Sequence, residues 1–472
     1  PFYTRSMVYT MPEFLERRYN PQSRTILSVI SLVSYVLTKV AVTVYAGGLV
    51  FQQVFGIKEL WGIDFFWIAA IGLVVLTALY TIFGGMKSVL YTSVLQTPIL
   101  LLGSLIILVL GFKELGGWDE MMRVCGAVTV NDYGDTMTNL IRSNDDANFP
   151  WLGALIGSAI IGFWYWCTDQ FIVQRVLSGK NEMEARRGTI FGAYLKLLPV
   201  FLFLIPGMIA FALHQKYIGA GGEGFLPMLE NGTANADAAF PTLVAKLLPA
   251  GVKGLVVCGI LAALMSSLAS LFNSSAMLFT IDFYKRFRPQ TSEKKLVGIG
   301  QVATVVIVIL GILWIPIMRS VGDVLYTYLQ DVQSVLAPGI AAAFLLGICW
   351  KRTSAQGGMW GLISGMVIGL TRLGAKVYYS NAGEVADSTF KYLFYDMNWL
   401  FFCGWMFLFC IIVVIVVSLA TEAPTAEKIQ GLVFGTATKE QKASTRASWN
   451  HWDIIHTVII LAITGAFYWY FW

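Results

Sequence analysis

The chain has 472 residues, of which 57% are hydrophobic and 13% are charged, and its mean hydropathy is +0.67. Apolar runs of about twenty residues recur along the whole length, which excludes an ordinary soluble domain and predicts a polytopic α-helical membrane protein. The net charge of +5 follows the loops, so it does not indicate nucleic-acid binding. The six cysteines have no paired spacing, and the HExxH and GxSxG motifs are absent, so the sequence indicates no disulfide framework, zinc site or hydrolytic machinery.

A short charged segment, 11–24, precedes the first membrane span. The first nine residues, PFYTRSMVY, are typical of the end of a membrane helix, so we expect further residues upstream. The pair Gly84-Gly85 is expected to close the second span. The pattern predicts one bundle without a soluble domain and with eleven spans, at residues 25–55, 62–83, 87–112, 150–180, 188–213, 253–284, 297–318, 324–349, 355–378, 397–420 and 454–472.

The distribution of Lys and Arg predicts the orientation of these spans. If the N-terminal segment lies inside and the spans alternate, twenty of the 33 basic residues fall in inner segments. This bias places both long loops, 113–149 and 214–252, outside.

The fourth span, 150–180, contains a chemically unusual stretch. Its helix becomes aromatic at Trp164, Tyr165 and Trp166 and then polar at Asp169. Because a carboxylate at membrane depth needs protein or a water-filled cavity around it, we expect this stretch to line a cavity. Gly162 is a position at which the helix can break. Aromatic faces beside polar groups suit a sugar-like ligand. The alternative is an interfacial aromatic belt at the end of an ordinary span.

Two more spans place polar side chains at membrane depth. Lys196, early in the fifth span, could donate hydrogen bonds to an anionic or hydroxylated solute, or it could extend to the membrane surface. Gln330 and Asp331 precede Pro338 in the eighth span, where we expect a helix break beside a cavity. The alternative is that these polar residues lie near the outer water.

The sixth span carries the hydroxyl-rich segment ALMSSLASLFNSS. Ala263, Ser266 and Ser267 stand at i, i+3 and i+4, so the two hydroxyls lie near the Ala263 carbonyl on one helical face. Such oxygens are ligands for a small hard cation. The alternative is a packing face of small residues, with Ser266, Ser270 and Ser274 bonded to the preceding turn.

Six segments of the chain carry a resemblance to a known family: TMPEFLERRYN, ALYTIFGGMKSVLYT, WYWCTDQFIVQR, YLKLLP, ALMSSLASLFNSSAMLFTIDFYK and GICWKRTSAQGGMWGLISG. In these segments the chain resembles the sodium/solute symporter family, and specifically its sodium/glucose (galactose) cotransporter branch. The resemblance implies an all-α, LeuT-like bundle of five plus five inverted-repeat helices. Residues 1–112 would end the first repeat, 150–350 would form the second repeat, and 353–472 would add C-terminal helices. The first repeat's opening helices would be missing from this chain.

The resemblance also implies roles for individual residues. Lys196 and Gln330 match the residues that hydrogen-bond the sugar, and Tyr165 matches an aromatic inner gate beneath it, with Trp166 beside it. The family's sodium site matches three residues of the sixth span, Ala263, Ser266 and Ser267.

Three positions depart from the family pattern. Gly162 stands where relatives carry a polar side chain that helps to hold the sugar. Ser93 stands where relatives usually carry Asp, and Ala269 stands where two-sodium relatives carry Thr. The resemblance and these departures together predict one Na+ per sugar.

The expected function is therefore Na+-coupled symport of a glucose- or galactose-like monosaccharide by alternating access. The expected partners are the sugar, sodium and the lipid bilayer of the plasma (inner) membrane, without nucleic acid, and the sequence does not indicate an oligomeric state. The alternatives are another solute of this family (inositol, sialic acid or an amino acid) or a non-transporting sugar sensor or channel. An enzyme would have only the lone carboxylate of Asp169, which is no acid/base pair.

Overall fold

The computed structural model describes the chain except for residues 1, 7, 230–231, 322–323, 383–385 and 472. Its helices form two compact units, each assembled from segments that are distant in sequence. The first unit contains Pro1–Thr38, Asn144–Gly192 and Ser274–Leu461, and the second contains Lys39–Ser143, Ala193–Asn273 and Ala462–Trp472. Among the described residues, four helical segments have residues in both units: the π-helical turn η1 (Tyr35–Val40), α9 (Glu182–Pro199), α12 (Ala250–Met277) and α21 (His451–Tyr470).

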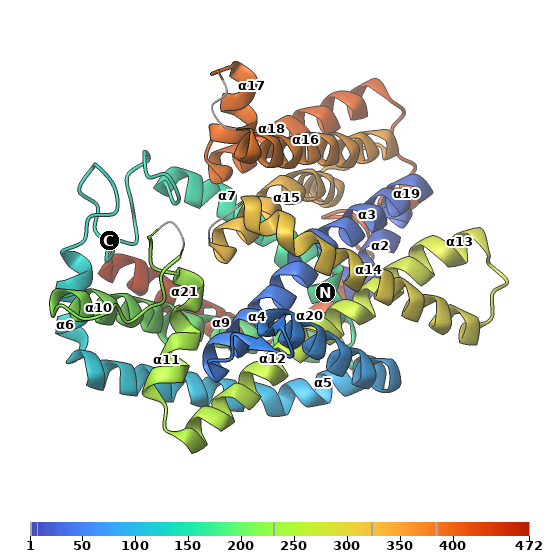
Figure 1. Cartoon of the computed structure of the whole chain (residues 1–472). Helices are drawn as coiled ribbons and strands as arrows, with labels where there is room; N and C mark the ends of the chain where they lie inside the picture. Colours follow the sequence, from blue (N-terminus) through green and yellow to red (C-terminus); the bar gives the residue numbers. More distant parts are fainter. Residues whose placement is uncertain (1, 7, 230–231, 322–323, 383–385, 472) are drawn as a thin grey trace. The chain divides into compact units, whose positions relative to one another are not determined.

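The other elements lie within one unit each and can be followed along the chain in Figure 1. The first unit holds α1 (Phe2–Ser6), α2 (Met11–Arg18), α3 (Pro21–Ser34), α7 (Trp151–Phe163), the π-helical turn η2 (Trp164–Thr168), α8 (Gln170–Leu177), the π-helical turn η5 (Leu278–Tyr284), α13 (Lys285–Phe287), α14 (Glu293–Val321), α15 (Leu325–Cys349), α16 (Ala355–Asn381), α17 (Thr389–Lys391), the π-helical turn η6 (Tyr392–Asp396), α18 (Trp399–Ala420), α19 (Ala426–Ile429) and α20 (Lys439–Ala447). The second unit holds α4 (Ala41–Phe55), strands β1 (Glu59–Leu60) and β2 (Ile63–Asp64), α5 (Phe65–Leu115), α6 (Trp118–Gly126), the π-helical turn η3 (Val200–Leu204), α10 (Ile205–Gly219), the 3-10 turn η4 (Ala236–Ala238) and α11 (Ala239–Leu247). The two strands pair antiparallel, with Glu59 opposite Asp64.

Short polar side chains mark where several helices of the first unit begin. Each accepts a hydrogen bond from a backbone N–H in the first turn, which would otherwise lack a partner. These capping residues are Thr10 for α2, Asn20 for α3, Asp169 for α8, Ser354 for α16 and Asn398 for α18. The helix boundaries in this unit are therefore encoded locally.

Close backbone contact between helices holds the first unit together. Helices α15, α16 and α18 lie side by side (Figure 1). A Cβ atom on Gly365 of α16 would lie 2.6 Å from the Cα atom of Gly339 in α15. A Cβ atom on Gly369 would lie 2.2 Å from the carbonyl oxygen of Val335. Small residues allow this approach because no side chain separates the two backbones.

The second unit has a core of larger apolar side chains. Helices α4, α5, α10 and α11 pack against one another, and α6 packs on α10. Met121, Ile209, Leu213, Leu243 and Val244 are fully buried there. Helix α11 lies within the segment 214–252 that the sequence predicts as a long loop.

Nine helices among the described residues are long and apolar enough to cross a membrane. Two of the eleven expected spans are not among them. One lies in Phe65–Leu79, which is apolar but shorter, and the other corresponds to α16. The total of eleven spans and their assembly into one bundle therefore stay predictions.

The expected turn at Gly84-Gly85 is wrong. Helix α5 runs without interruption through 51 residues, from Phe65 to Leu115. At 1.5 Å per residue it is about 76 Å long, well beyond the ~30 Å of a bilayer core. Two glycines make a turn sterically possible but do not enforce it, because the backbone remains free to be helical.

The expected helix break at Pro338 is also wrong, since α15 continues through Pro338 to Cys349. Proline removes only one backbone donor, and neighbouring helices can hold the interrupted turn in place. Here Pro338 is buried, and the adjacent Gly339 packs against α16. Packing therefore outweighs the local tendency to break.

Candidate functional site

The aromatic stretch of the fourth span forms an irregular helix end. Helix α7 continues through Gly162, so the break that this glycine would permit does not occur there. The chain instead forms the π-helical turn η2 and leaves the helical conformation at Asp169, whose φ and ψ are −79° and 123°. A glycine weakens a helix without ending it when its neighbours keep their backbone hydrogen bonds. A π-helical turn, in contrast, changes the backbone hydrogen-bond pattern itself, and here the helix ends after such a turn.

Three consecutive aromatic side chains of η2 have different environments. Trp164 is buried in the core of the first unit, Tyr165 is half-buried, and Trp166 is 50% exposed. The rings of Tyr165 and Trp166 meet edge to face, with their centroids 5.2 Å apart. An apolar ring surface is thus anchored on one side by Trp164 and remains accessible at Trp166.

A buried polar pair lies at the end of this aromatic surface. The Tyr35 hydroxyl donates to Oδ1 of Asp169 at 3.0 Å, and both side chains are buried. The backbone N–H of Phe171 also donates to that carboxylate oxygen, at 3.1 Å, and to the Tyr35 oxygen at 3.1 Å. The carboxylate therefore caps α8 and fixes the point at which the helix breaks. Sequence analysis missed Tyr35, because no local pattern connects it to Asp169.

Gln330 lies in the first turns of α15 and is half-buried. Its side-chain amide donates to the hydroxyl of Tyr326 at 3.2 Å, one helical turn earlier. The neighbouring Tyr328 is buried; its hydroxyl accepts a hydrogen bond from the indole N–H of Trp314 at 2.6 Å and donates to the Leu37 carbonyl at 3.0 Å. Leu37 belongs to the π-helical turn η1, and the irregular backbone hydrogen bonding of this turn leaves the Leu37 carbonyl available as an acceptor.

The carboxylate of Asp331, next to Gln330, is paired within the first unit. Lys376 of α16 contacts its Oδ2, and a guanidinium nitrogen of the buried Arg372 lies 3.7 Å from Oδ1. Arg372 also donates to the carbonyl of Met397 at 2.7 Å. Sequence analysis noted Asp331 but did not identify these two partners, which follow it by 41 and 45 positions. Charged groups at membrane depth are expected to pair in this way.

Lys196 lies in α9, three residues before Pro199 and the π-helical turn η3, and its side chain is exposed. It belongs to the second unit, whereas Tyr165, Trp166 and Gln330 belong to the first. Their joint contribution to one sugar site therefore stays a prediction.

The three residues expected to bind sodium lie in α12 within the second unit. Ser266 is buried, Ala263 is half-buried and Ser267 is exposed. The Oγ atoms of Ser266 and Ser93 are 2.6 Å apart, and the Ser266 carbonyl accepts a hydrogen bond from Ser270. A hydroxyl has two lone pairs, so Ser266 can donate to Ser93 and still coordinate a hard cation, a donor set that fits Na+ as cargo.

Comparison with known proteins identifies the family. The model of the "Sodium:solute symporter family" matches residues 1–365. The chain is 36% identical to a sodium/mannose cotransporter of Bos taurus, over 100% of the chain and 81% of that protein. It is 36% identical to sodium/myo-inositol cotransporter 2 of Homo sapiens and 37% identical to sodium/glucose cotransporter 1 of Ovis aries, covering 92% and 89% of the chain but 65% of each relative.

The chain belongs to the sodium:solute symporter family. A solved structure of a Na+-coupled sialic acid symporter superposes with a TM-score of 0.66, at 21% identity, covering 90% of this chain and 80% of that one. This likeness confirms the predicted inverted-repeat, LeuT-like fold. Membership of a transporter family also confirms the prediction of a multi-pass membrane transporter rather than an enzyme.

Proposed function

We propose that this symporter-family chain couples the entry of Na+ to the uptake of a monosaccharide by alternating access at the plasma membrane. The observation that carries this proposal is the end of α7, where an accessible aromatic surface adjoins the buried Tyr35–Asp169 pair. A sugar presents C–H faces that stack on aromatic rings and hydroxyls that need hydrogen-bond partners. The names of the mannose and glucose relatives support the same class of solute.

In this proposal each candidate residue has a specific task. Tyr165 closes the site from the inner side, with Trp166 extending the ring surface, and Lys196 and Gln330 hydrogen-bond the sugar hydroxyls. Sodium is bound by the remaining three residues, Ala263, Ser266 and Ser267, whose oxygens are of the type that Na+ prefers.

A second candidate solute is myo-inositol, because the human myo-inositol cotransporter 2 has the same identity to this chain, 36%, as the bovine mannose cotransporter, over 92% of the chain against 100%. Inositol has hydroxyls in a ring of similar size but lacks the ring oxygen of a sugar. A non-transporting sensor or channel remains the alternative from another functional class.

The decisive experiment uses the full-length protein in proteoliposomes. Labelled mannose, glucose, galactose and myo-inositol are each offered with an inward Na+ gradient and, as control, an equal K+ gradient. We expect Na+-dependent accumulation of at least one hexose, and counterflow against an internal load of the same unlabelled hexose. Accumulation of myo-inositol alone would replace the sugar assignment, and flux without counterflow would indicate a channel.

The gate assignment has its own test in the same assay. Tyr165→Phe keeps the ring and should retain most uptake, whereas Tyr165→Ala removes the closing surface and should abolish accumulation. The gate assignment fails if the Ala variant accumulates the solute to the level of the unsubstituted protein.

A further inference from the structure

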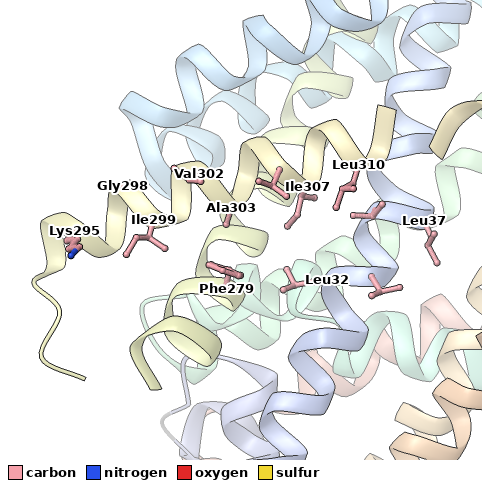
Figure 2. Close-up of a pocket in the computed structure, with 13 residues that line it drawn as sticks. Leu32, Leu37, Phe279, Lys295, Gly298, Ile299, Val302, Ala303, Ile307 and Leu310 are labelled. Carbon is pink, nitrogen blue, oxygen red and sulfur yellow. The ribbon is translucent and has the colours of Figure 1, made fainter. Parts of the chain in front are cut away.

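An apolar groove of about 680 Å³ lies in the first unit (Figure 2), and none of its lining residues belongs to α7 or to the aromatic turn η2. Leu32 and Val36 line one wall, Val302 and Leu310 of α14 line the other, and Phe279 of η5 forms part of the floor. Thirteen residues line the groove, and apart from Lys295 all of them are apolar or glycine. Such a lining suits hydrocarbon and offers nothing to a polar solute.

The groove is open along its length. On α14, Val302 is 66% exposed and Leu310 is 47% exposed, whereas Ala303 and Ile307 are each only 7% exposed. The helix therefore presents a buried row to the groove floor and an exposed row at its lip. Among the described helices, α14 is apolar and long enough to cross a membrane. Its exposed apolar row is therefore suited to contact with lipid, and an occupant from the lipid phase can reach the groove along it.

The charge at one end of the groove is positive. Lys295 is exposed and lies at this end, as Figure 2 shows, and among the described residues it forms no ion pair or hydrogen bond. The segment 285–295 that leads to it holds five basic residues and one acidic residue, Glu293. Basic segments at the inner surface attract anionic headgroups.

The length of the groove matches a single lipid chain. From Lys295 to Leu310 the helix rises by about 22 Å at 1.5 Å per residue. One leaflet contributes roughly half of the ~30 Å hydrocarbon core, or about 15 Å. An acyl chain along α14 therefore fits this length and leaves the remainder for a headgroup beside Lys295.

We propose that the groove binds an anionic phospholipid of the inner leaflet, with one acyl chain between α3 and α14 and its phosphate on Lys295. The apolar lining accounts for the binding of an acyl chain. The unpaired ammonium of Lys295 accounts for the preference for an anionic headgroup. This lipid site is independent of the transported solute.

The test measures lipid binding to the full-length protein in a neutral detergent by native mass spectrometry. Phosphatidylglycerol and phosphatidylcholine with identical acyl chains are titrated separately. We expect one tightly bound phosphatidylglycerol and a weaker interaction with phosphatidylcholine. Lys295→Gln should weaken phosphatidylglycerol binding by about fivefold, whereas the control Lys294→Gln, on the adjacent exposed lysine outside the groove, should change it less than twofold.

A second pair of variants tests the acyl chain. Val302→Trp fills the groove, and the control Val305→Trp places the same ring on another exposed position of α14 that does not line it. Only the first should reduce binding of phosphatidylglycerol. Three results would overturn the proposal. Phosphatidylglycerol binding could fall equally in both Trp variants or equally in both Lys variants, or the unsubstituted protein could bind the two lipids with equal affinity. Competition by glycerol phosphate, which carries the phosphate without a chain, would overturn it as well.

A measurement on the unsubstituted protein covers the case of a variant that does not fold. Phosphatidylglycerol with a photoreactive group in one acyl chain is cross-linked in proteoliposomes, and the labelled peptides are mapped. We expect labelling concentrated on 298–310 and 32–37. Even labelling of all lipid-facing helices would overturn the proposal.

Discussion

The carboxylate of Asp169 defines the end of the aromatic stretch, and its environment depends on a distant phenol. Tyr35→Phe removes a donor to this buried group while keeping the ring. We expect the loss to destabilise the first unit by ~1–3 kcal/mol, because a buried acceptor loses a hydrogen bond. Thermal unfolding in detergent measures this change as a lower midpoint.

Tyr326→Phe is the matched control for that prediction. Its hydroxyl also hydrogen-bonds a polar side chain, that of Gln330, but Tyr326 is 56% exposed. Water can replace an exposed hydrogen bond, so this variant should unfold close to the midpoint of the unsubstituted protein. Equal shifts of the unfolding midpoint in the two variants would mean that burial of the Tyr35–Asp169 pair contributes nothing to the stability of the first unit.

Ser266 and Ser270 are two buried hydroxyls one turn apart on α12, with different partners. Ser266→Ala removes an oxygen from the proposed sodium site, and we expect the sodium concentration for half-maximal uptake to rise by roughly tenfold. Linkage requires solute affinity at low sodium to fall as well.

Ser270→Ala is the control, since that hydroxyl donates to the carbonyl of its own helix at Ser266. In this variant the sodium concentration for half-maximal uptake should stay within about twofold of the value for the unsubstituted protein. If Ser266→Ala also leaves the sodium dependence unchanged, Ser266 has only a packing role together with Ser93.

At the level of whole elements, the contact between α15 and α16 depends on two glycines. A side chain at Gly365 would collide with the backbone at Gly339, which cannot move without separating the helices. Gly365→Val should therefore destabilise the first unit by ~3 kcal/mol or more, as overpacking does.

Gly374→Val provides the control on the same helix, because Gly374 is exposed and a Cβ atom there meets nothing within 4 Å. Valine in a helix costs only a few tenths of a kcal/mol relative to other residues and improves on glycine. Similar unfolding midpoints for both variants would exclude tight packing at Gly365.

The same elements show which features could be predicted from the sequence. Local chemistry indicated the polar end of the fourth span, and there Asp169 caps a helix. Glycine and proline were less informative, since Gly84, Gly162 and Pro338 all lie inside continuous helices. Each only permits or weakly favours a break, and neighbouring segments decide the outcome.

Partners distant in sequence could not be predicted. Tyr35 is 134 positions from Asp169, and Lys376 is 45 positions from Asp331. Hydrophobic periodicity and composition describe one helix at a time, whereas these contacts depend on how helices pack against one another. The family resemblance supplied the fold and the specific roles of the candidate site residues, and the fold is confirmed.

For the molecule as a whole, the number of sodium ions sets how steeply it can concentrate its solute. Ser93 and Ala269 stand where two-sodium relatives are expected to carry Asp and Thr. Ser93 lies within hydrogen-bond distance of Ser266, and Ala269 is fully buried without a side-chain oxygen. A second cation would lack one negative charge and one ligand, so we predict one sodium per solute.

One ion sets a limit on accumulation. A charge crossing 100 mV contributes ~2.3 kcal/mol and a tenfold sodium gradient ~1.4 kcal/mol, which together support roughly 500-fold accumulation. The reversal potential distinguishes the ratios directly. With equal sodium on both sides and a tenfold solute gradient, net flux should reverse near 59 mV for one ion and near 30 mV for two. The Ser93→Asp variant serves as a comparison, because a restored carboxylate could only move the potential toward the two-ion value. A reversal near 30 mV in the unsubstituted protein would show that oxygens other than those of Ser93 and Ala269 hold a second sodium.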